Sequence, residues 1–262
     1  MKSSYKKKLI FVVNVDWGFT NFRAPIATEA QKKGYEVHLI TEVTNKYNSA
    51  EILKDLGIKV HNVEFKRGSE NPLSLFRLLF NLINIFKSLE PDVVHLVTIK
   101  SVIIGGLAAR ITKINSVVIA ISGLGFSFID NSFSSKIRKF FLKHAYRIVL
   151  NCKKVILIFQ NKDDAREILC INKNRDVIHH IIPGSGVDLN KFFWSQEDLK
   201  QKPKIIMVSR LLTHKGVLEY LEAAEEILQE GIEVDFELIG DIDPENPASL
   251  TNDQINEIKH TD

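Results

Sequence analysis

The cations of the stretch SRLLTHKGV, residues 209–217, have the types and spacing needed to hold a diphosphate. Arg210 follows the apolar run KIIMVS, which predicts a buried strand, and Lys215 stands beside Gly216, where a helical pattern begins. Ligands of open α/β sheets bind at the carboxyl ends of strands. A guanidinium, an ammonium and free helix amides there suit a diphosphate whose charge grows as a bond to it breaks. We therefore predict that Arg210 and Lys215 stabilise a leaving group; two ordinary surface cations are the alternative.

A glycine-rich turn forms a second candidate site, in IIPGSGVDLNKF at residues 181–192. A predicted strand ends at Pro183, and the residues Gly184, Ser185 and Gly186 follow it. Such a turn lets backbone amides touch a sugar or a phosphate. We predict that these three residues bind the same donor as the cations, and the alternative is an ordinary loop between domains.

The loops after the other predicted strands supply a third set of candidates. In DWGFTNFR, Gly18 predicts a tight turn, and Arg23 offers a bidentate phosphate contact near a helix that begins at Pro25. Lys100 precedes a helix that Ser101 is expected to cap. A structural turn and a plain surface lysine are the alternatives. The predicted acceptor-binding residues are Asp16, Gly18, Arg23, Lys100, Gly123, Gly125 and Asp130.

These residues are positioned by strands that alternate with helices. Runs rich in Val and Ile, apolar on both faces, predict strands at 9–15, 36–40, 58–63, 92–97, 116–122 and 155–159. Amphipathic patterns predict helices at 25–33, 48–56, 72–89, 101–113, 134–149 and 161–169. The alternation predicts an α/β fold with a doubly wound parallel sheet in residues 1–182. Residues 183–203 are a predicted linker, and 204–262 begin a second, Rossmann-like domain with a strand, a helix and a strand.

The composition is that of a globular protein without a strong charge. Hydrophobic residues make up 45% of the 262 residues, and the net charge of +3 is too small to indicate nucleic acid. Cys152 and Cys170 have no metal-ligand spacing, which indicates a reducing compartment and no disulfide framework. We expect no metal and no cofactor.

A basic segment without acidic residues lies between Asp130 and Asp163. It predicts a surface that faces phosphates or an anionic membrane, and the alternative is a solvated basic helix face. Its cations alternate with Ile137, Phe140, Phe141 and Tyr146, and the run PLSLFRLLFNLINIF at 72–86 is strongly apolar. We predict a cytoplasmic protein, peripheral on the inner face of the plasma membrane, with no stretch suited to span it. The alternative is that the apolar residues simply face the sheet. The cations are Lys136, Arg138, Lys139, Lys143, Arg147, Lys153 and Lys154.

The motifs SRLLTHKGV and PGSGVDLNKF together resemble glycosyltransferase family 4, the retaining GT-B enzymes that use nucleotide sugars. The resemblance implies that Arg210 and Lys215 hold the donor diphosphate. The segments NFRAPI, NPLSLF, GLGFSFID, HKGVLEY and GDIDPENPAS resemble a bacterial subgroup that extends polyprenyl-diphosphate-linked saccharides, often with an N-acetylhexosamine. The resemblance thus implies transfer of a hexose or N-acetylhexosamine from a UDP-sugar to such an acceptor, in the synthesis of a surface polysaccharide such as O-antigen or capsule.

The sequence departs from the family pattern in two places. The loop SGLG at 122–125 lacks the histidine that many members carry there, so no catalytic histidine is assigned. The family's paired glutamates, eight residues apart, fall beyond residue 262; Glu222 with Glu230, and Glu237 with Glu245, share only the spacing. We therefore expect a C-terminally truncated chain that is inactive alone.

The sequence leaves two alternatives to an active transferase open. One is a non-catalytic fragment that binds acceptor or partner, and the other is a GT-B UDP-sugar epimerase. A dinucleotide-dependent oxidoreductase is disfavoured, because no G-x-G-x-x-G motif follows the first strand.

Overall fold

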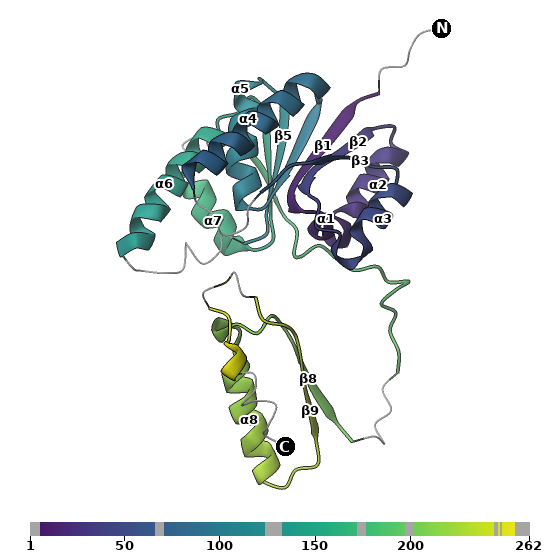
Figure 1. Ribbon diagram of the computed structural model, residues 1–262, viewed down its shortest axis with the longest axis vertical. Coiled ribbons are helices and arrows are strands. Elements are labelled where there is room, and N and C mark those ends of the chain that lie inside the picture. The colour runs from purple at the N-terminus through teal and green to yellow at the C-terminus, as the bar shows by residue number, and fades with distance from the viewer. Residues whose placement is uncertain are drawn as a thin grey trace. The chain divides into compact units, whose positions relative to one another are not determined.

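The computed structural model describes residues 6–65, 71–123, 133–171, 177–196, 202–243, 246 and 248–254, with only the backbone of 133–139. The chain forms two compact units, Met1–Val187 and Asp188–Asp262 (Figure 1). The boundary falls inside the predicted linker. The assignment of the units to acceptor and nucleotide sugar stays a prediction.

The first unit is built on a parallel sheet of seven strands in the order β3-β2-β1-β4-β5-β6-β7. The order reverses between β1 and β4, and ligands of doubly wound sheets bind outside the carboxyl ends of the strands, at such a reversal. The predicted strands all form, with ends shifted by one or two residues. They are β1 (Lys8–Val15), β2 (Glu36–Glu42), β3 (Lys59–Asn62), β4 (Val93–Val97), β5 (Ser116–Ile121), β6 (Val155–Phe159) and β7 (Ile178–Ile181).

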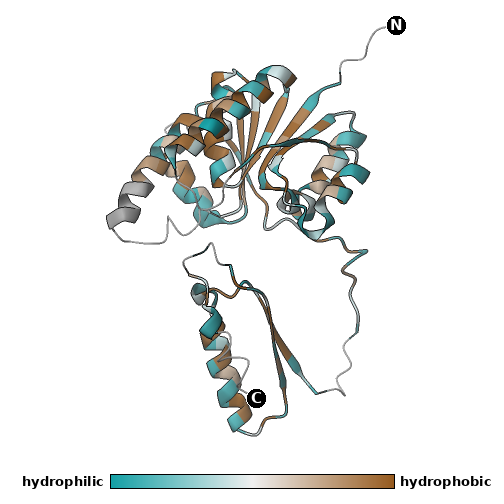
Figure 2. Ribbon diagram, in the orientation of Figure 1, coloured by the Kyte–Doolittle hydropathy of each residue, from teal (hydrophilic) through white to brown (hydrophobic). Residues whose placement is uncertain are grey.

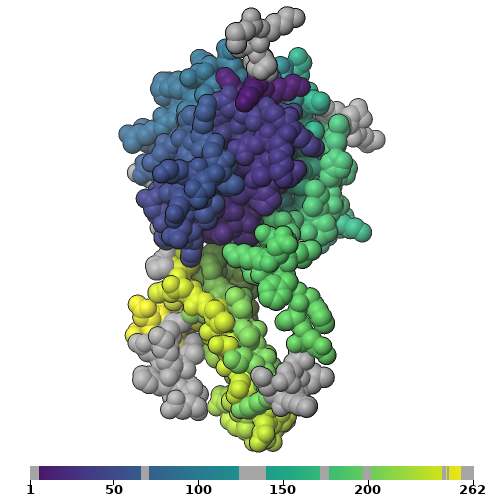
Figure 3. All heavy atoms as spheres, turned by 90° about the vertical axis from the view of Figure 1, so that its right-hand side faces the viewer, coloured from purple at the N-terminus to yellow at the C-terminus, as the bar shows by residue number. Residues whose placement is uncertain are grey.

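Helices cover the two faces of this sheet unequally (Figure 1). On one face lie α1 (Asp16–Phe22), α2 (Ala24–Lys32) and α3 (Ser49–Asp55), beside the half formed by β1, β2 and β3; this helix layer is purple and indigo in Figure 3. The other face packs against α4 (Pro72–Leu89), α5 (Gly106–Ile111), α6 (Phe133–Val149) and α7 (Lys162–Ile171). Within the described residues, no helix covers β5, β6 and β7 on the α1–α3 face.

Two apolar cores result from the strict alternation of side chains along the strands. Ile10 and Val12 of β1 face the α4–α7 layer, while Leu9, Phe11 and Val13 face α1–α3. Figure 2 shows how the apolar residues concentrate on the strands between the two layers. A sheet buried on both faces explains why its strands have continuous apolar runs.

Helix α4 is long and apolar enough by composition to cross a membrane, which the sequence analysis did not expect. One stripe of the helix packs against the core, where Leu78, Leu82 and Phe86 are buried at a spacing of four residues. Only 17% of the helix is buried, so most of its surface is exposed or half-buried. The Asn71 side chain caps it by accepting from the Leu73 amide, at 3.0 Å.

Two consecutive glycines at the start of α5 allow close packing. The π-helical turn η2 (Ser101–Gly105) leads into α5, so Gly105 ends this turn and Gly106 begins the helix. A Cβ atom on Gly105 would lie 2.7 Å from a Leu96 methyl, and one on Gly106 only 2.3 Å from a Val149 methyl.

The segment after β1 is helix α1, and the prediction of a glycine turn at residues 16–23 was wrong. Gly18 lies inside α1, without the positive φ of a turn glycine. The helix forms because Phe19 is buried and Asp16, at its first position, accepts the Trp17 amide at 2.9 Å.

The second unit pairs β8 (Lys204–Val208) with β9 (Asp235–Ile239) in parallel and packs them against α8 (Val217–Gln229). The 3₁₀ turn η4 (Thr213–Lys215) precedes α8, and Gly216 separates the two. Leu211, Val217 and Leu250 form a small core. Gly240, the residue after β9, lies close to the backbone of Ser209. A Cβ atom on Gly240 would lie 1.8 Å from the Ser209 carbonyl oxygen.

Candidate functional site

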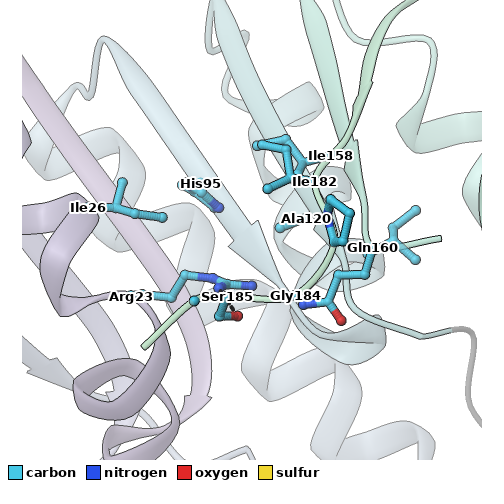
Figure 4. A pocket seen from close by; sticks show the side chains of 12 residues that line it. Arg23, Ile26, His95, Ala120, Ile158, Gln160, Ile182, Gly184 and Ser185 are labelled. Carbon is cyan, nitrogen blue, oxygen red and sulfur yellow. Dashed lines mark hydrogen bonds between the residues drawn. The ribbon is translucent and has the colours of Figure 1, made fainter. Parts of the chain in front are cut away.

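A pocket of about 340 Å³ opens in the first unit, near the carboxyl ends of β5, β6 and β7. It lies on the sheet face that the described helices leave uncovered. Figure 4 shows Arg23, Ile26 and His95 on one side of it and Ile158, Ile182 and Gln160 on the other. The wall is mostly aliphatic, with a few polar groups, as is usual for small-molecule sites.

Arg23 is the cation of this pocket. It is 8% exposed and follows α1, and its Nη1 donates to the Phe22 carbonyl and to Ser185 Oγ, both at 2.9 Å. Its Nε is buried without a hydrogen-bond partner, and no carboxylate among the described residues pairs with the guanidinium. Burial lowers the pKa of Arg23. A buried cation without a counter-charge is unfavourable by itself, so a ligand with an acceptor oxygen would be stabilising here.

His95, on β4, was not predicted and is the second polar group of the pocket. It is 6% exposed, its ring stacks on Phe11 at 5.0 Å between centroids, and its Nε2 has no partner among the described residues. Burial, together with the charge of Arg23, lowers the pKa of His95 to about 3. The imidazole is therefore neutral at physiological pH, with one ring nitrogen as donor and the other as acceptor.

The turn 184–186 completes the pocket. Gly184 and Gly186 both have a φ of 73°, a conformation that favours glycine, as the predicted turn requires. Ser185 lies between them and accepts from Arg23. Arg23 and Ser185 thus line one pocket, although they lie 162 positions apart and were predicted for the acceptor and the donor respectively.

Asp16 lies outside the pocket and organises a loop. It is fully buried and accepts from the backbone and hydroxyl of Thr44, from the Asn45 amide and from Ser49 Oγ, in addition to the Trp17 amide. Burial alone would raise the pKa of Asp16, but these hydrogen bonds outweigh it and lower the pKa below its usual value. The structure gives this carboxylate a structural task, and acceptor binding by Asp16 stays a prediction.

The other predicted acceptor residues have separate surroundings. Lys100 donates to the Phe65 carbonyl at 2.9 Å, which ties the chain after β3 to the end of β4. Ser101 does not cap the helix as predicted; it donates to Asn14 Oδ1 at 2.7 Å. Gly123 follows β5 with a φ of 131°, while Gly125 and Asp130 lie outside the described residues.

Asn14 also accepts from Thr98 Oγ1, at 2.7 Å. Thr98 has a φ of 77°, which is strained for a β-branched residue. This strained position lies directly after β4, near the reversal of the strand order, and the hydrogen bond to Asn14 supports it.

The two predicted donor cations lie in the second unit, at the positions expected from sequence. Arg210 lies two residues after the end of β8, and its Nη1 pairs with Asp243 Oδ2 at 2.6 Å. The side chain is 52% exposed, so this pair is weak, at about 0–1 kcal/mol. Lys215 is exposed at the end of η4, and its side chain makes no hydrogen bond or ion pair with another described residue. Gly216, with a φ of 79°, then begins α8. Both cations are available to an anion.

Among the described residues, no three His, Cys, Asp or Glu side chains lie close enough together to hold a metal ion.

Comparison with known proteins identifies the family. A family model described as "Glycosyl transferase 4-like" matches residues 8–161. The chain belongs to this family. The glycosyl transferase 4-like protein is 30% identical over 251 residues to an N,N'-diacetylbacillosaminyl-diphospho-undecaprenol α-1,3-N-acetylgalactosaminyltransferase of Campylobacter jejuni, covering 90% of this chain and 64% of that protein. It is 29% identical to a UDP-Gal:α-D-GlcNAc-diphosphoundecaprenol α-1,3-galactosyltransferase of Escherichia coli, over 64% of this chain and 46% of that protein.

The fold has matches among solved structures. A glycosyltransferase from Rickettsia africae superposes with a TM-score of 0.60 at 18% identity, over 97% of this chain and 64% of that one. The predicted GT-B class is confirmed. The 262-residue chain thus spans less than two thirds of the length of each of these relatives.

Proposed function

We propose that this protein transfers a sugar from a UDP-sugar to an undecaprenyl-diphosphate-linked saccharide whose lipid-proximal sugar is N-acetylated, with retention at the anomeric carbon. The observation that carries the proposal is the 30% identity to the C. jejuni transferase over 90% of the chain. The names of that enzyme and of the E. coli relative both describe acceptors with an N-acetylated sugar on diphosphoundecaprenol. Both names are those of glycosyltransferases, which disfavours a UDP-sugar epimerase.

In this proposal the two cations of the second unit bind the donor diphosphate. Arg210 exchanges its weak contact with Asp243 for the phosphates, because an anion of higher charge is the stronger partner for an exposed guanidinium. Lys215 adds a second charge at the start of α8. Together they stabilise UDP as the glycosidic bond to it breaks. Arg23 in the first unit binds the acceptor. Ser185, which the sequence predicted for the donor, is reassigned to the acceptor because Arg23 Nη1 donates to it within one pocket.

The test is a transfer assay with undecaprenyl-diphosphate-linked GlcNAc and a panel of UDP-sugars, in which released UDP and the extended lipid product are both measured. Arg210→Ala and Lys215→Ala should each raise the barrier by about 2–4 kcal/mol. The matched control is Lys202→Ala, which removes a similarly exposed cation that pairs with Asp235 at 2.6 Å.

The outcomes separate the alternatives. Wild-type turnover in both cation variants would refute the donor site. Acceptor binding without UDP release would support the non-catalytic fragment. Epimerisation of UDP-GlcNAc without acceptor would support the epimerase.

We further propose that the helix layer formed by α4–α7 lies on an anionic membrane. Leu73, Phe76 and Phe80 form an exposed apolar stripe on α4, and Phe140 and Phe141 are exposed on α6, within the basic segment. Such faces insert aromatic side chains while their cations attract headgroups.

Two of the α6 residues that the sequence predicted for this surface have other surroundings. Tyr146 is instead fully buried in the core, and Lys143 pairs with Glu167 at 2.9 Å. The membrane surface is therefore proposed without Tyr146.

Liposome co-sedimentation tests this surface. Vesicles with anionic lipid should bind the protein, and the double change of Phe140 and Phe141 to serine should reduce binding at least about tenfold. The control Ile52→Ser alters an exposed residue of α3, on the other helix layer, and should have no effect. Equal binding to neutral vesicles would contradict the proposal, as would unchanged binding by the double variant.

A further inference from the structure

We propose that the pocket of Arg23 and His95 receives the acetamido group of an N-acetylated sugar, and that this contact selects the acceptor. The inference rests on the proposed function only for the source of the sugar. The recognition of an acetamido group follows from the pocket itself.

The size of the pocket suits one sugar residue. Its volume of about 340 Å³ is near the lower end of the ~300–1,000 Å³ typical of small-molecule sites. A complete nucleotide sugar needs more room and more cations, while Arg23 is the one Lys or Arg among the described lining residues. The pocket therefore favours a single sugar ring and its substituent.

The unpaired polar atoms define what the ligand must offer. Arg23 Nε is a donor without an acceptor, and His95 Nε2 is a ring nitrogen without a partner, both buried. Native proteins rarely leave such atoms unpaired. An amide group carries one carbonyl acceptor and one N–H donor. The carbonyl oxygen can accept from Arg23 Nε, and the amide N–H can donate to the Nε2 of the neutral imidazole.

The wall suits the rest of the acetamido group. Ile26, Ala120, Ile158 and Ile182 give the same pocket an aliphatic surface, where a methyl group can be buried. The Gly184–Gly186 turn and Gln160 offer backbone and amide groups to the sugar hydroxyls. The apolar wall and the two unpaired polar atoms together match an acetamido group better than a bare hydroxyl.

An anion fits the same surroundings less well. His95 stays neutral, so only Arg23 supplies positive charge, and part of that guanidinium is already bound to Ser185 and the Phe22 carbonyl. A phosphate brings several oxygens and up to two charges, which this aliphatic wall would desolvate without compensating donors. A sugar carboxylate is the closest competitor and is tested directly below.

The experiment measures binding by the full 262-residue chain, without any transfer step. The probes are GlcNAc 1-phosphate, glucose 1-phosphate, glucuronic acid and UDP-GlcNAc, titrated by calorimetry or ligand-observed NMR. GlcNAc 1-phosphate should bind at least about tenfold more tightly than glucose 1-phosphate, because a site that pairs an amide is left with unpaired groups when the amide is missing.

Two variants should abolish this preference. Arg23→Met keeps the aliphatic stem and removes the donors. His95→Phe keeps the ring stacked on Phe11 and removes both nitrogens. The matched controls are Arg110→Met and His179→Phe, which alter exposed side chains outside the pocket and should retain the tenfold preference. If His95→Phe fails to fold by circular dichroism, Arg23→Met alone decides.

Each contrary outcome has its own meaning. Equal binding of the two sugar phosphates, or no binding of either, overturns the acetamido pocket. Tighter binding of glucuronic acid identifies an anion site instead. Binding of UDP-GlcNAc alone, lost in Arg23→Met, assigns the pocket to the donor and overturns its role in acceptor selection. An acetamido preference that persists in a chain without transfer activity would retain this inference while the proposed function fails.

Discussion

Replacing Asp16 by alanine should destabilise the first unit by about 3–5 kcal/mol. The carboxylate joins the start of α1 to the loop after β2 through five accepted hydrogen bonds, at 2.6–3.2 Å. The hydroxyls of Thr44 and Ser49 can turn to other partners, but the amides of Trp17, Thr44 and Asn45 cannot. A buried donor left unpaired costs roughly 1–3 kcal/mol. These three amides are part-buried, so each should cost near the lower end, at about 1–1.7 kcal/mol, which gives about 3–5 kcal/mol for the three.

The nearly isosteric Asp16→Asn should be milder, at about half that cost. One Asp16 oxygen accepts from the Trp17 amide and the other from the amides of Thr44 and Asn45. The amide group of asparagine, in either orientation, therefore points its NH₂ at one or more backbone N–H groups.

Urea unfolding measured by Trp17 fluorescence tests this reasoning. The chain has two tryptophans, so the experiment uses a Trp194→Phe background to remove the signal of the second unit. The control is Asp55→Ala, which alters an exposed residue at the end of α3 whose side chain makes no hydrogen bond with another described residue. An Asp16→Ala variant within about 0.5 kcal/mol of the control would refute the structural role of this carboxylate.

The pH dependence of the unfolding free energy tests the contribution of the Asp16 charge independently. The pKa of Asp16 in the folded state is below its usual value, and in the unfolded chain it is about 3.9. The contribution of the ionised carboxylate is thus complete above about pH 4 and is lost as the pH falls through the folded pKa. The stability gap between wild type and Asp16→Asn should be constant near neutrality and should narrow in acid.

Three further changes have clear expected outcomes. Gly106→Ala should lower the unfolding free energy by about 1–3 kcal/mol, measured in urea, because its Cβ would lie 2.3 Å from a methyl group of α6. Asp243→Asn should tighten UDP binding two- to fivefold by calorimetry, since it removes the competitor for Arg210; weaker binding would show that the carboxylate positions the guanidinium. Burial lowers the pKa of His38 and of its partner His61, so the unfolded chain binds more protons and stability falls below about pH 6.5. His38→Gln should flatten this decline in melting temperature between pH 5 and 7.

The sheet was predictable because its signal is local and repeated. Each strand carries its own apolar run, and parallel strands buried on both faces leave little room for another interpretation. Helix α1 was missed because seven residues are too few to show a helical period, and because Asp16 is held by residues 28–33 positions away. A local pattern cannot report such contacts.

The candidate site was predictable in its parts and unpredictable in its assembly. Arg23 and Ser185 were each singled out, but only the fold brings residues 162 positions apart together. His95 was missed, although a polar residue within the apolar run VVHLV of a doubly buried strand was a usable signal. Asp243 lies in a polar turn of common composition, and nothing local distinguishes it as the partner of Arg210.

The strands of the sheet differ in how many neighbours they pair with and how well they are covered, so their backbone amides should differ in hydrogen-exchange rate. The centre of the sheet, β1, β4 and β5, is paired on both sides, so its amides should exchange with solvent only when the unit unfolds as a whole. The outermost strand β7 has one neighbour and four exposed residues, and its backbone should exchange far sooner. The turn that follows β7 is the same turn that Arg23 holds through Ser185. A ligand in the pocket would therefore slow exchange along β7, which makes this edge strand a built-in reporter of occupancy.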